Sequence, residues 1–393
     1  MTGNDVVITG IGLVSSLGEG VEPHWRALSD SVTPVLDHDR FAPYTVHPLP
    51  EIDWNLQIPK RGDQRQMETW QRLGTYAAGL ALDDAGIKTD EALCASMDMI
   101  VAAGGGERDA EADTLILSEA RASNLRDVML NEKLMSELRP TLFLAQLSNL
   151  LAGNISIVHK VTGSSRTFMG EDGSGISAVE IAVARIRAGQ STHAIVGGAY
   201  NSEHVNMLLG LELGGHLHQG DWAPVWNRGG AEGGGLIPGS GGAFLVIESR
   251  GHAEARGARI HAQIEAVTTG QAHRGRQNLS DAIAAVFEPV ADDVAPFVVS
   301  SASGAHLATA AELVALARYP TVAMRGIGSM FGYMREAQFP FAVAMAALAV
   351  SRGEVFPPID PESELVAFSP IDAAIALTVG VDRAEGAARI VRA

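Results

Sequence analysis

The order of apolar and polar positions along the chain predicts strands that alternate with helices. Residues 6–12 (VVITGIG) form a β-branched run that ends in glycines, which predicts an opening strand and a turn. Apolar residues recur at helical spacing over residues 71–85 and 174–188, and a glycine follows each stretch, as is common at the end of a helix. Residues 339–350 are strongly apolar, which predicts a buried helix.

Apolar runs bounded by turn residues predict further strands at residues 97–103, 193–198, 243–248, 296–301 and 373–379. Strands and helices that alternate at these lengths predict an α/β layered architecture. The charged segment 107–137 shows little β pattern, and we expect it to be helical, peripheral or partly mobile.

Composition narrows the classes of function. The chain has 393 residues, 46% of them hydrophobic, and a net charge of −17, so its average field repels nucleic acid and anionic membrane surfaces. The apolar stretch 339–350 is too short to cross a bilayer. Cys94 is the single cysteine and cannot form an internal disulfide, and no secretory segment precedes the first strand. We therefore expect a cytoplasmic protein with no membrane span and no nucleic-acid partner.

Four collinear stretches, spread over most of the chain, resemble the β-ketoacyl-ACP synthases, the condensing enzymes of the thiolase superfamily. They are Val6 to Gly18, Arg72 to Gly86, Gly163 to Gly198 and Asn227 to Ile260. The resemblance implies a thiolase fold, in which two similar α/β halves make a five-layered αβαβα arrangement, and it implies a dimer. We expect residues 1–250 to form the N-terminal half with the dimerisation region and residues 251–393 to form the C-terminal half.

The chemistry of this family requires a thiolate that carries the acyl chain and donors that stabilise an enolate. The family uses one Cys and two His, with a Lys near the second His. In this chain the matching positions hold Asp172 for the Cys, Ser301 for the first His, Tyr333 for the second His and Gly328 for the Lys. A carboxylate cannot form an acyl thioester, and its charge repels a nearby enolate. The resemblance therefore implies that no catalytic residue is intact.

The family also has a glycine-rich gating loop, Phe-Gly-Phe-Gly-Gly, near the C-terminus. The matching segment here is Phe368-Ser369-Pro370-Ile371-Asp372, which keeps one Phe and loses the glycines. Because proline fixes φ, we expect this loop to be stiffer than a glycine hinge.

Other candidate residues have structural interpretations that we prefer. Cys94 is expected to be a small, semi-buried hydrophobe. His306, near Glu312, and Glu171 are the remaining groups that could support residual decarboxylation, together with Asp172 and Tyr333. His216 and His218, near His204, lack a carboxylate at ligand spacing, so no metal is expected.

Two further patterns are also interpreted as structural. The glycines of residues 229–242 match neither a phosphate loop nor a dinucleotide fingerprint, so no cofactor is expected. Arg61, Arg65 and Arg72 could dock an acidic carrier protein, but a solvated face is the simpler interpretation.

The leading hypothesis is a non-catalytic subunit similar to the chain-length factors of fatty-acid or polyketide biosynthesis. Such a subunit forms a heterodimer with an active ketosynthase, shapes its acyl tunnel and meets the acyl carrier protein mainly through that partner. One alternative is a divergent but active 3-oxoacyl-ACP synthase or malonyl-ACP decarboxylase. Another is an acyl-binding module without a ketosynthase partner. The product, its chain length and the partner's identity do not follow from the residues.

Overall fold

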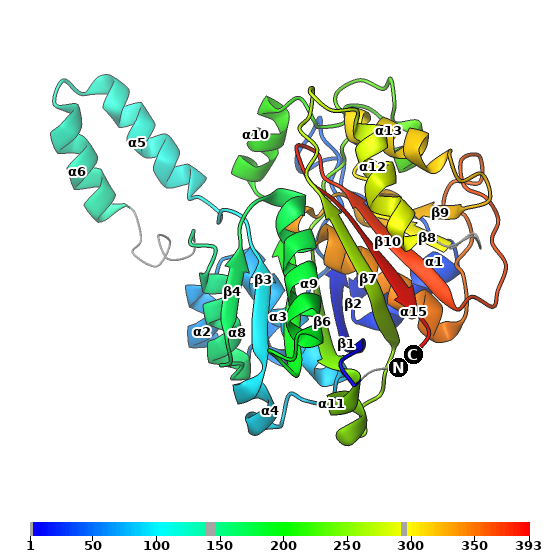
Figure 1. The fold of residues 1–393 in the computed structure, drawn as a ribbon. Helices are drawn as coiled ribbons and strands as arrows, with labels where there is room; N and C mark the ends of the chain where they lie inside the picture. The colour runs from blue at the N-terminus through cyan, green and yellow to red at the C-terminus, as the bar shows by residue number, and fades with distance from the viewer. Residues whose placement is uncertain (1–2, 138–145, 292–296) are drawn as a thin grey trace.

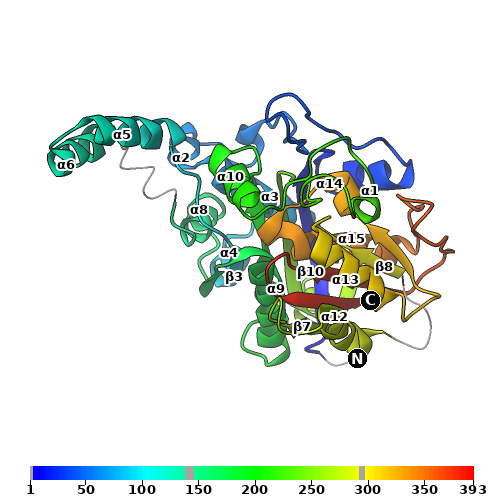
Figure 2. The same cartoon turned by 90° about the horizontal axis from the view of Figure 1, so that it is seen from above.

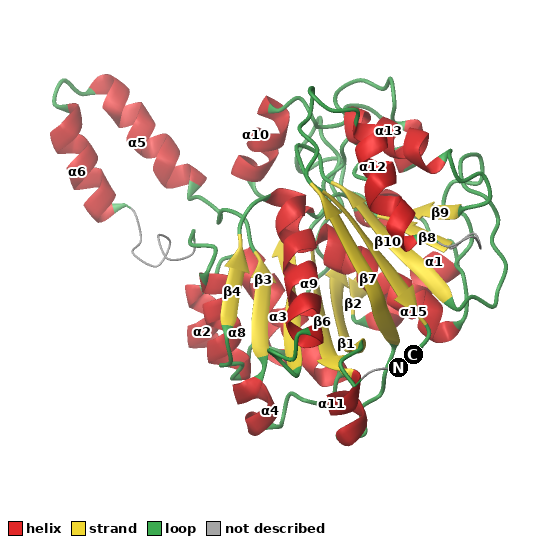
Figure 3. Ribbon diagram, viewed as in Figure 1, coloured by secondary structure: helices red, strands yellow, loops and turns green. Residues whose placement is uncertain are grey.

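A central mixed sheet organises the protein. The computed structural model describes residues 3–137, 146–291 and 297–393. Within these residues, eleven strands run in the order β4-β3-β5-β6-β1-β7-β11-β10-β8-β9, and β2 pairs with β1 (Figure 1, Figure 3).

The strands of the first half are β1 (Val6–Ser15), β2 (Gly18–Glu19), β3 (Asp98–Ala102), β4 (Ser165–Phe168), β5 (His193–Tyr200) and β6 (Gly241–Ser249). Those of the second half are β7 (Ala262–Gly270), β8 (Phe297–Ser300), β9 (Ala323–Gly326), β10 (Ala373–Val379) and β11 (Glu385–Val391).

The strand order repeats between the two halves. The first half runs β4-β3-β5-β6-β1, and the second half, from its own outer edge, runs β9-β8-β10-β11-β7. The two units meet where β1 pairs with β7, over the three residue pairs Val6 with Ile264, Val7 with Gln263 and Ile8 with Ala262. The division expected after residue 250 would fall between β6 and β7, and it stays a prediction.

The helices are α1 (Val21–Ser29), α2 (Arg61–Gln66), α3 (Thr69–Asp84), α4 (Glu91–Ser96), α5 (Ala110–Ala122), α6 (Arg126–Ser136), α8 (Leu150–His159), α9 (Glu171–Arg187), α10 (Val205–Leu213), α11 (Arg250–Ala255), α12 (Leu279–Phe287), α13 (His306–Leu316), α14 (Gly328–Phe331) and α15 (Gln338–Arg352). Short 3₁₀ helices are η1 (Trp54–Leu56), η2 (Val225–Asn227), η3 (Glu288–Val290) and η4 (Arg335–Ala337).

Two helices form the middle layer between the halves. Both α9 and α15 contact strands of each half and pack against one another, while α3 with α8 covers the outer face of the first half and α12 with α13 covers that of the second. Residues 338–350 of α15 are all buried, which confirms the buried helix expected from the apolar stretch 339–350. A helix that is apolar on every side is stable only when protein surrounds it. The site described below lies beside the first turn of α9.

The segment 107–137 contains two helices that project from the body. Figure 1 and Figure 2 both show α5 and α6 extending away from the sheet as a hairpin. Their exposed apolar residues include Leu117, which is 64% exposed, and Met135, which is 80% exposed. The expectation of a helical, peripheral segment is confirmed. Within the described residues, no helix combines the length and the apolar content needed to cross a membrane.

Candidate functional site

The first turn of α9 positions a carboxyl group where a helix accepts negative charge. The chain leaves β4, turns at Gly170 with φ of 111°, and enters α9 with Glu171 and Asp172 in its first turn. Helix N-termini favour anionic side chains, because the first backbone N–H groups have no partner within the helix. Asp172 is 1% exposed, so its carboxyl group is held inside the protein.

Two donors converge on one oxygen of Asp172. The hydroxyl of Tyr333 donates to Oδ2 over 2.9 Å, and the backbone N–H of Val381 donates to the same atom over 3.3 Å. The other oxygen, Oδ1, is buried and has no hydrogen-bond partner among the described residues. The carboxyl group of Asp172 therefore takes up both of these donors, the Tyr333 hydroxyl and the Val381 N–H.

Burial controls the protonation of this pair. It raises the pKa of Asp172 to about 7, against the lowering effect of the hydrogen bonds from Tyr333 and Val381. Burial, with the charge of Asp172 as a second cause, raises the pKa of Tyr333 well above its usual value. At neutral pH Tyr333 is thus an uncharged donor and cannot take up a proton as an imidazole does. Neither residue is a thiol, so neither can form the acyl thioester that a cysteine forms.

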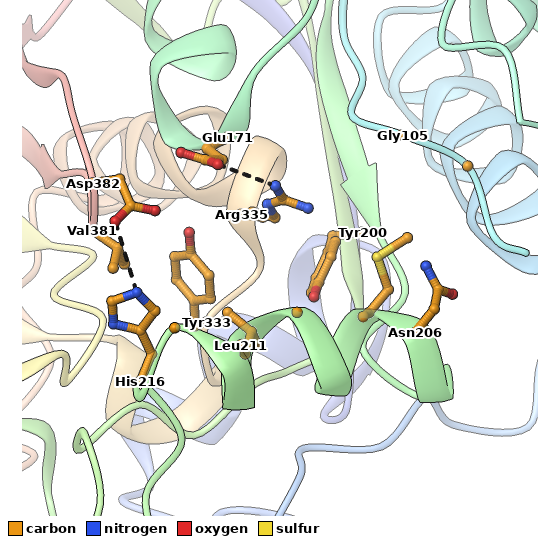
Figure 4. A pocket seen from close by; sticks show the side chains of 14 residues that line it. Gly105, Glu171, Tyr200, Asn206, Leu211, His216, Tyr333, Arg335, Val381 and Asp382 are labelled. Atoms are coloured by element: carbon orange, nitrogen blue, oxygen red, sulfur yellow. Dashed lines mark hydrogen bonds and ion pairs between the residues drawn. The ribbon is translucent and has the colours of Figure 1, made fainter.

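A cavity of about 450 Å³ opens beside Tyr333. Figure 4 shows Tyr333 between the ion pair of Arg335 with Glu171 and the contact of His216 with Asp382. The shortest N–O distances of these pairs are 3.4 Å and 3.7 Å. The full lining is Gly105, Gly106, Glu171, Tyr200, Asn206, Met207, Gly210, Leu211, Gly214, His216, Tyr333, Arg335, Val381 and Asp382.

A second buried acid lies close to this wall. Glu336 is 1% exposed, and its Oε1 has no hydrogen-bond partner among the described residues. A Cβ on Gly104 would collide with this oxygen, so the glycine leaves room for the carboxyl group. Burial raises the pKa of Glu336, although the charge of Arg335 opposes the rise. Buried carboxyl groups disfavour a further negative charge, such as that of an enolate, in the same place.

The sequence matches a known protein family over more than half of its length. A family model described as "Beta-ketoacyl synthase, N-terminal domain" matches residues 3–253. The chain belongs to the β-ketoacyl synthase family. The 3-oxoacyl-[acyl-carrier-protein] synthase 2 of Vibrio harveyi is 26% identical over 274 residues, which are 67% of this chain and 62% of that protein. The synthase 2 of Rhizobium meliloti is 28% identical over 282 residues, which are 66% and 62% of the two chains. The match thus spans about 62% of the length of these curated relatives.

Solved structures establish the fold. An ishigamide ketosynthase/chain length factor matches with a TM-score of 0.80 and 20% identity, covering 99% of both chains. A β-ketoacyl synthase from Burkholderia phymatum matches with a TM-score of 0.78 and 20% identity over 99% of both chains. The expected thiolase fold is confirmed.

Of the four β-ketoacyl synthase positions expected at the site, Tyr333 lines the cavity, and Asp172, Ser301 and Gly328 do not. Ser301 is buried, and its hydroxyl pairs with that of Thr378 over 2.5 Å. Gly328 begins α14, where a Cβ would collide with the carbonyl oxygen of Ala302. This backbone has no space for a lysine side chain at residue 328. Of the four matched positions, the structure brings Asp172 and Tyr333 into direct contact.

The segment 368–372, expected to be the gating loop, does not lie beside the cavity. None of the residues 368–372 lines the cavity, and Phe368 is 83% exposed. The turn between β10 and β11 lines it instead, through Val381 and Asp382. Val379, Gly380 and Val381 lie where β10 ends and this turn begins, just before the last strand.

Arg335 and Glu336 are further site residues that the sequence analysis missed. They follow Tyr333 directly, but no sequence motif marks an Arg-Glu pair there. Arg335 lies 6.0 Å from the ring centroid of Tyr200, and its φ of 48° turns the chain into the cavity wall.

Four other candidate residues from the sequence analysis lie at separate places in the fold, outside the cavity lining. Cys94 is buried and its thiol faces the carbonyl of Ile87, so it takes no part in the site. Glu312 is buried and accepts a hydrogen bond from Ser300. His204 caps α10, and His218 contacts the carbonyl of Asp221.

His216 is the one expected histidine that lines the cavity, where it faces Asp382. Among the described residues, no three His, Cys, Asp or Glu side chains are grouped to hold a metal ion. Of the three arginines considered for carrier docking, Arg61 and Arg65 belong to α2 and are exposed, while Arg72 lies over the ring of Trp54.

Proposed function

We propose that this chain is a non-catalytic β-ketoacyl synthase subunit that pairs with an active ketosynthase and shapes its acyl tunnel. The observation that carries the proposal is the contact of Asp172 with Tyr333. The carboxyl group of Asp172 accepts the hydrogen bonds of Tyr333 and Val381, so an acyl thioester has neither a thiolate nor these two free donors at the start of α9.

Exposed edges and apolar residues support a partner chain. Strand β4 ends the sheet with one side unpaired, and unpaired strand edges favour addition of another strand. The α5–α6 hairpin presents Leu117 and Met135 to solvent. Exposed apolar residues on a projecting hairpin are better explained by a protein interface than by a free surface.

The negative net charge of the chain disfavours direct docking of an acidic acyl carrier protein. With a net charge of −17, the average field repels an acidic acyl carrier protein. Docking of the carrier through the ketosynthase avoids this repulsion. The solved ishigamide ketosynthase/chain length factor is by its name an assembly of the two kinds of subunit, and its fold matches this chain.

The decisive experiment is co-expression with a Cys/His/His ketosynthase encoded beside this chain, followed by native mass spectrometry. We expect a one-to-one heterodimer that makes a product of defined length with malonyl-ACP. Enlarging the cavity by Leu211→Ala should change the distribution of chain lengths, whereas Leu307→Ala on the exposed face of α13 should leave it unchanged.

The same preparation separates the alternatives. A stable and exclusive homodimer would contradict the proposal. Release of carbon dioxide from malonyl-ACP by the chain alone, abolished by Asp172→Asn, would instead support a decarboxylase. A retained acyl ligand without any partner would support an acyl-binding module.

A further inference from the structure

Arg228 is a buried cation without a counter-charge. It follows η2 and is 0% exposed. Its Nε donates to the carbonyl of Ala223 over 2.8 Å, and its Nη1 makes a long contact of 3.5 Å with the carbonyl of Gly235. Its Nη2 is buried and has no partner among the described residues, and no described carboxylate forms an ion pair with this guanidinium.

His306 reaches the same place from the second half of the chain. It is the first residue of α13, and its Nε2 is buried without a hydrogen-bond partner among the described residues. A Cβ on Gly235 would lie 2.7 Å from this Nε2, and a Cβ on Gly304 would lie 2.9 Å from Nη1 of Arg228. Both glycines have positive φ, at 88° and 86°, so this close crossing requires residues without a side chain. The Arg228 guanidinium and the His306 imidazole thus both lie against one pair of glycines, and each has a buried nitrogen, Nη2 and Nε2, without a described partner.

The neighbouring histidine cannot balance the charge. Burial lowers the pKa of His47 to about 3, and the positive charge of Arg228 adds to this effect. His47 is therefore neutral at pH 7. Burial lowers the pKa of Arg228 to about 9, so the guanidinium itself remains charged.

Burying an unpaired charge costs several kcal/mol, and a neutral water molecule satisfies donors without offsetting the charge. We propose that Arg228 and His306 bind a small inorganic anion of the size of chloride at the crossing of Gly235 and Gly304. The N-terminal end of the eleven-residue α13 also favours negative charge there. The anion would tie the loop that carries Arg228 to α13, and this role is independent of the proposed ketosynthase partnership.

Crystals of the full chain soaked in sodium bromide test the site directly. We expect an anomalous bromide peak within hydrogen-bonding reach of Nη2 of Arg228 and Nε2 of His306. Density there without anomalous signal, as from water, would overturn the proposal.

A solution measurement tests the site with Arg228 left in place. Thermal unfolding is followed in sodium chloride and in sodium methanesulfonate at equal ionic strength. Chloride should stabilise the wild type progressively with concentration, since a ligand that binds only the folded state shifts unfolding by mass action.

The matched variants are His306→Ala and His273→Ala, the second on an exposed histidine. The first should weaken apparent chloride affinity about tenfold, as expected for loss of one charge-assisted hydrogen bond of about 1.4 kcal/mol. The second should leave the affinity unchanged. Equal chloride dependence of both variants, or none in the wild type, would contradict the site.

Discussion

The hydroxyl of Tyr333 donates a hydrogen bond to Asp172 over 2.9 Å, and the two residues are 161 positions apart in the chain. Asp172 comes from α9 of the first half, whereas Tyr333 follows α14 of the second. The contact forms only when both halves are folded against one another. The contact of Asp172 with Tyr333 is therefore both the centre of the candidate site and a reporter of the assembled fold. Substitution of either residue tests it.

Asp172→Asn should stabilise the protein increasingly as the pH rises from about 4 to about 7. Burial raises the pKa of Asp172 to about 7 in the folded chain, whereas an unfolded Asp has a pKa of about 3.9. Between these values the folded state keeps a proton that the unfolded state has lost. Raising the pH therefore destabilises the wild type, by at most about 1.4 kcal/mol per pH unit, and the effect levels off above the folded pKa.

Urea unfolding of both proteins at pH 5, 6, 7 and 8 measures this difference. The other buried carboxyl groups, such as Glu312 and Glu364, are present in both proteins, so their contributions largely cancel in the comparison. The charge of Glu336 raises the pKa of Asp172, so its interaction with Asp172 is part of the measured difference. A difference in the free energy of unfolding that does not change with pH would contradict the assignment.

Tyr333→Phe should cost about 1.5–3 kcal/mol at pH 8, where Asp172 is mostly ionised, because a hydrogen bond to a charged group is lost. The cost should fall at pH 5, where the carboxyl group is neutral. Tyr200→Phe is the matched control, since Tyr200 is also buried beside the cavity but its hydroxyl makes no described hydrogen bond. Equal losses in the two variants would show that the Tyr333 hydroxyl contributes nothing specific.

Gly328→Ala should destabilise the protein by about 1–3 kcal/mol, because the added methyl group meets the backbone carbonyl of Ala302. Gly62→Ala in α2 is the control, because a Cβ there has no neighbour within 4 Å. Alanine is the better helix former, so Gly62→Ala should be neutral or gain up to about 1 kcal/mol. Denaturant unfolding of both variants at one pH checks the contrast, and a mild effect at Gly328 would show that the site can accommodate a side chain.

Leu117→Glu on α5 should weaken the proposed heterodimer at least about tenfold, since a charge would be buried at the interface. Leu307→Glu on α13, a residue of similar exposure, should leave the affinity unchanged. Surface plasmon resonance against the co-expressed ketosynthase gives both values. Circular dichroism verifies that each variant is folded, and unchanged binding by Leu117→Glu would remove the α5–α6 hairpin from the interface.

Local patterns predicted much of the fold. Residues 71–85 and 174–188 were expected to be helical and correspond to α3 and α9, and α9 begins three residues earlier than the pattern indicated. The β-branched opening run corresponds to β1. These segments have strong periodicity, and their partners are the nearest layers of the sheet.

Strands whose pattern is weak in isolation were not predicted. Glu385–Val391 forms β11, yet its residues EGAARIV lack a clear alternation. Antiparallel pairing with β10 and β7 stabilises it. Tertiary pairing of this kind is invisible to a local pattern.

The sequence predicts site residues only where a short motif of this chain can be matched to a motif of the β-ketoacyl synthases. Asp172 and Tyr333 were placed by their neighbours in sequence and do meet in space. The resemblance puts the gating loop at residues 368–372, which keep one Phe, and this stays a prediction, whereas the structure places Val381 and Asp382 in the cavity wall. Arg335 and Glu336 belong to none of the motifs that the sequence analysis uses, so their place in the cavity wall follows only from the folded chain.

The short pairing of β1 with β7 has a mechanical consequence. Three residue pairs join the two units of the sheet, so α9 and α15, rather than the backbone ladder, must hold the units in place. A disturbance that loosens these two helices would separate Asp172 from Tyr333 while each unit keeps its own strands. The junction is thus the weakest point under load, and the chain should lose its acid–phenol contact before it loses its secondary structure.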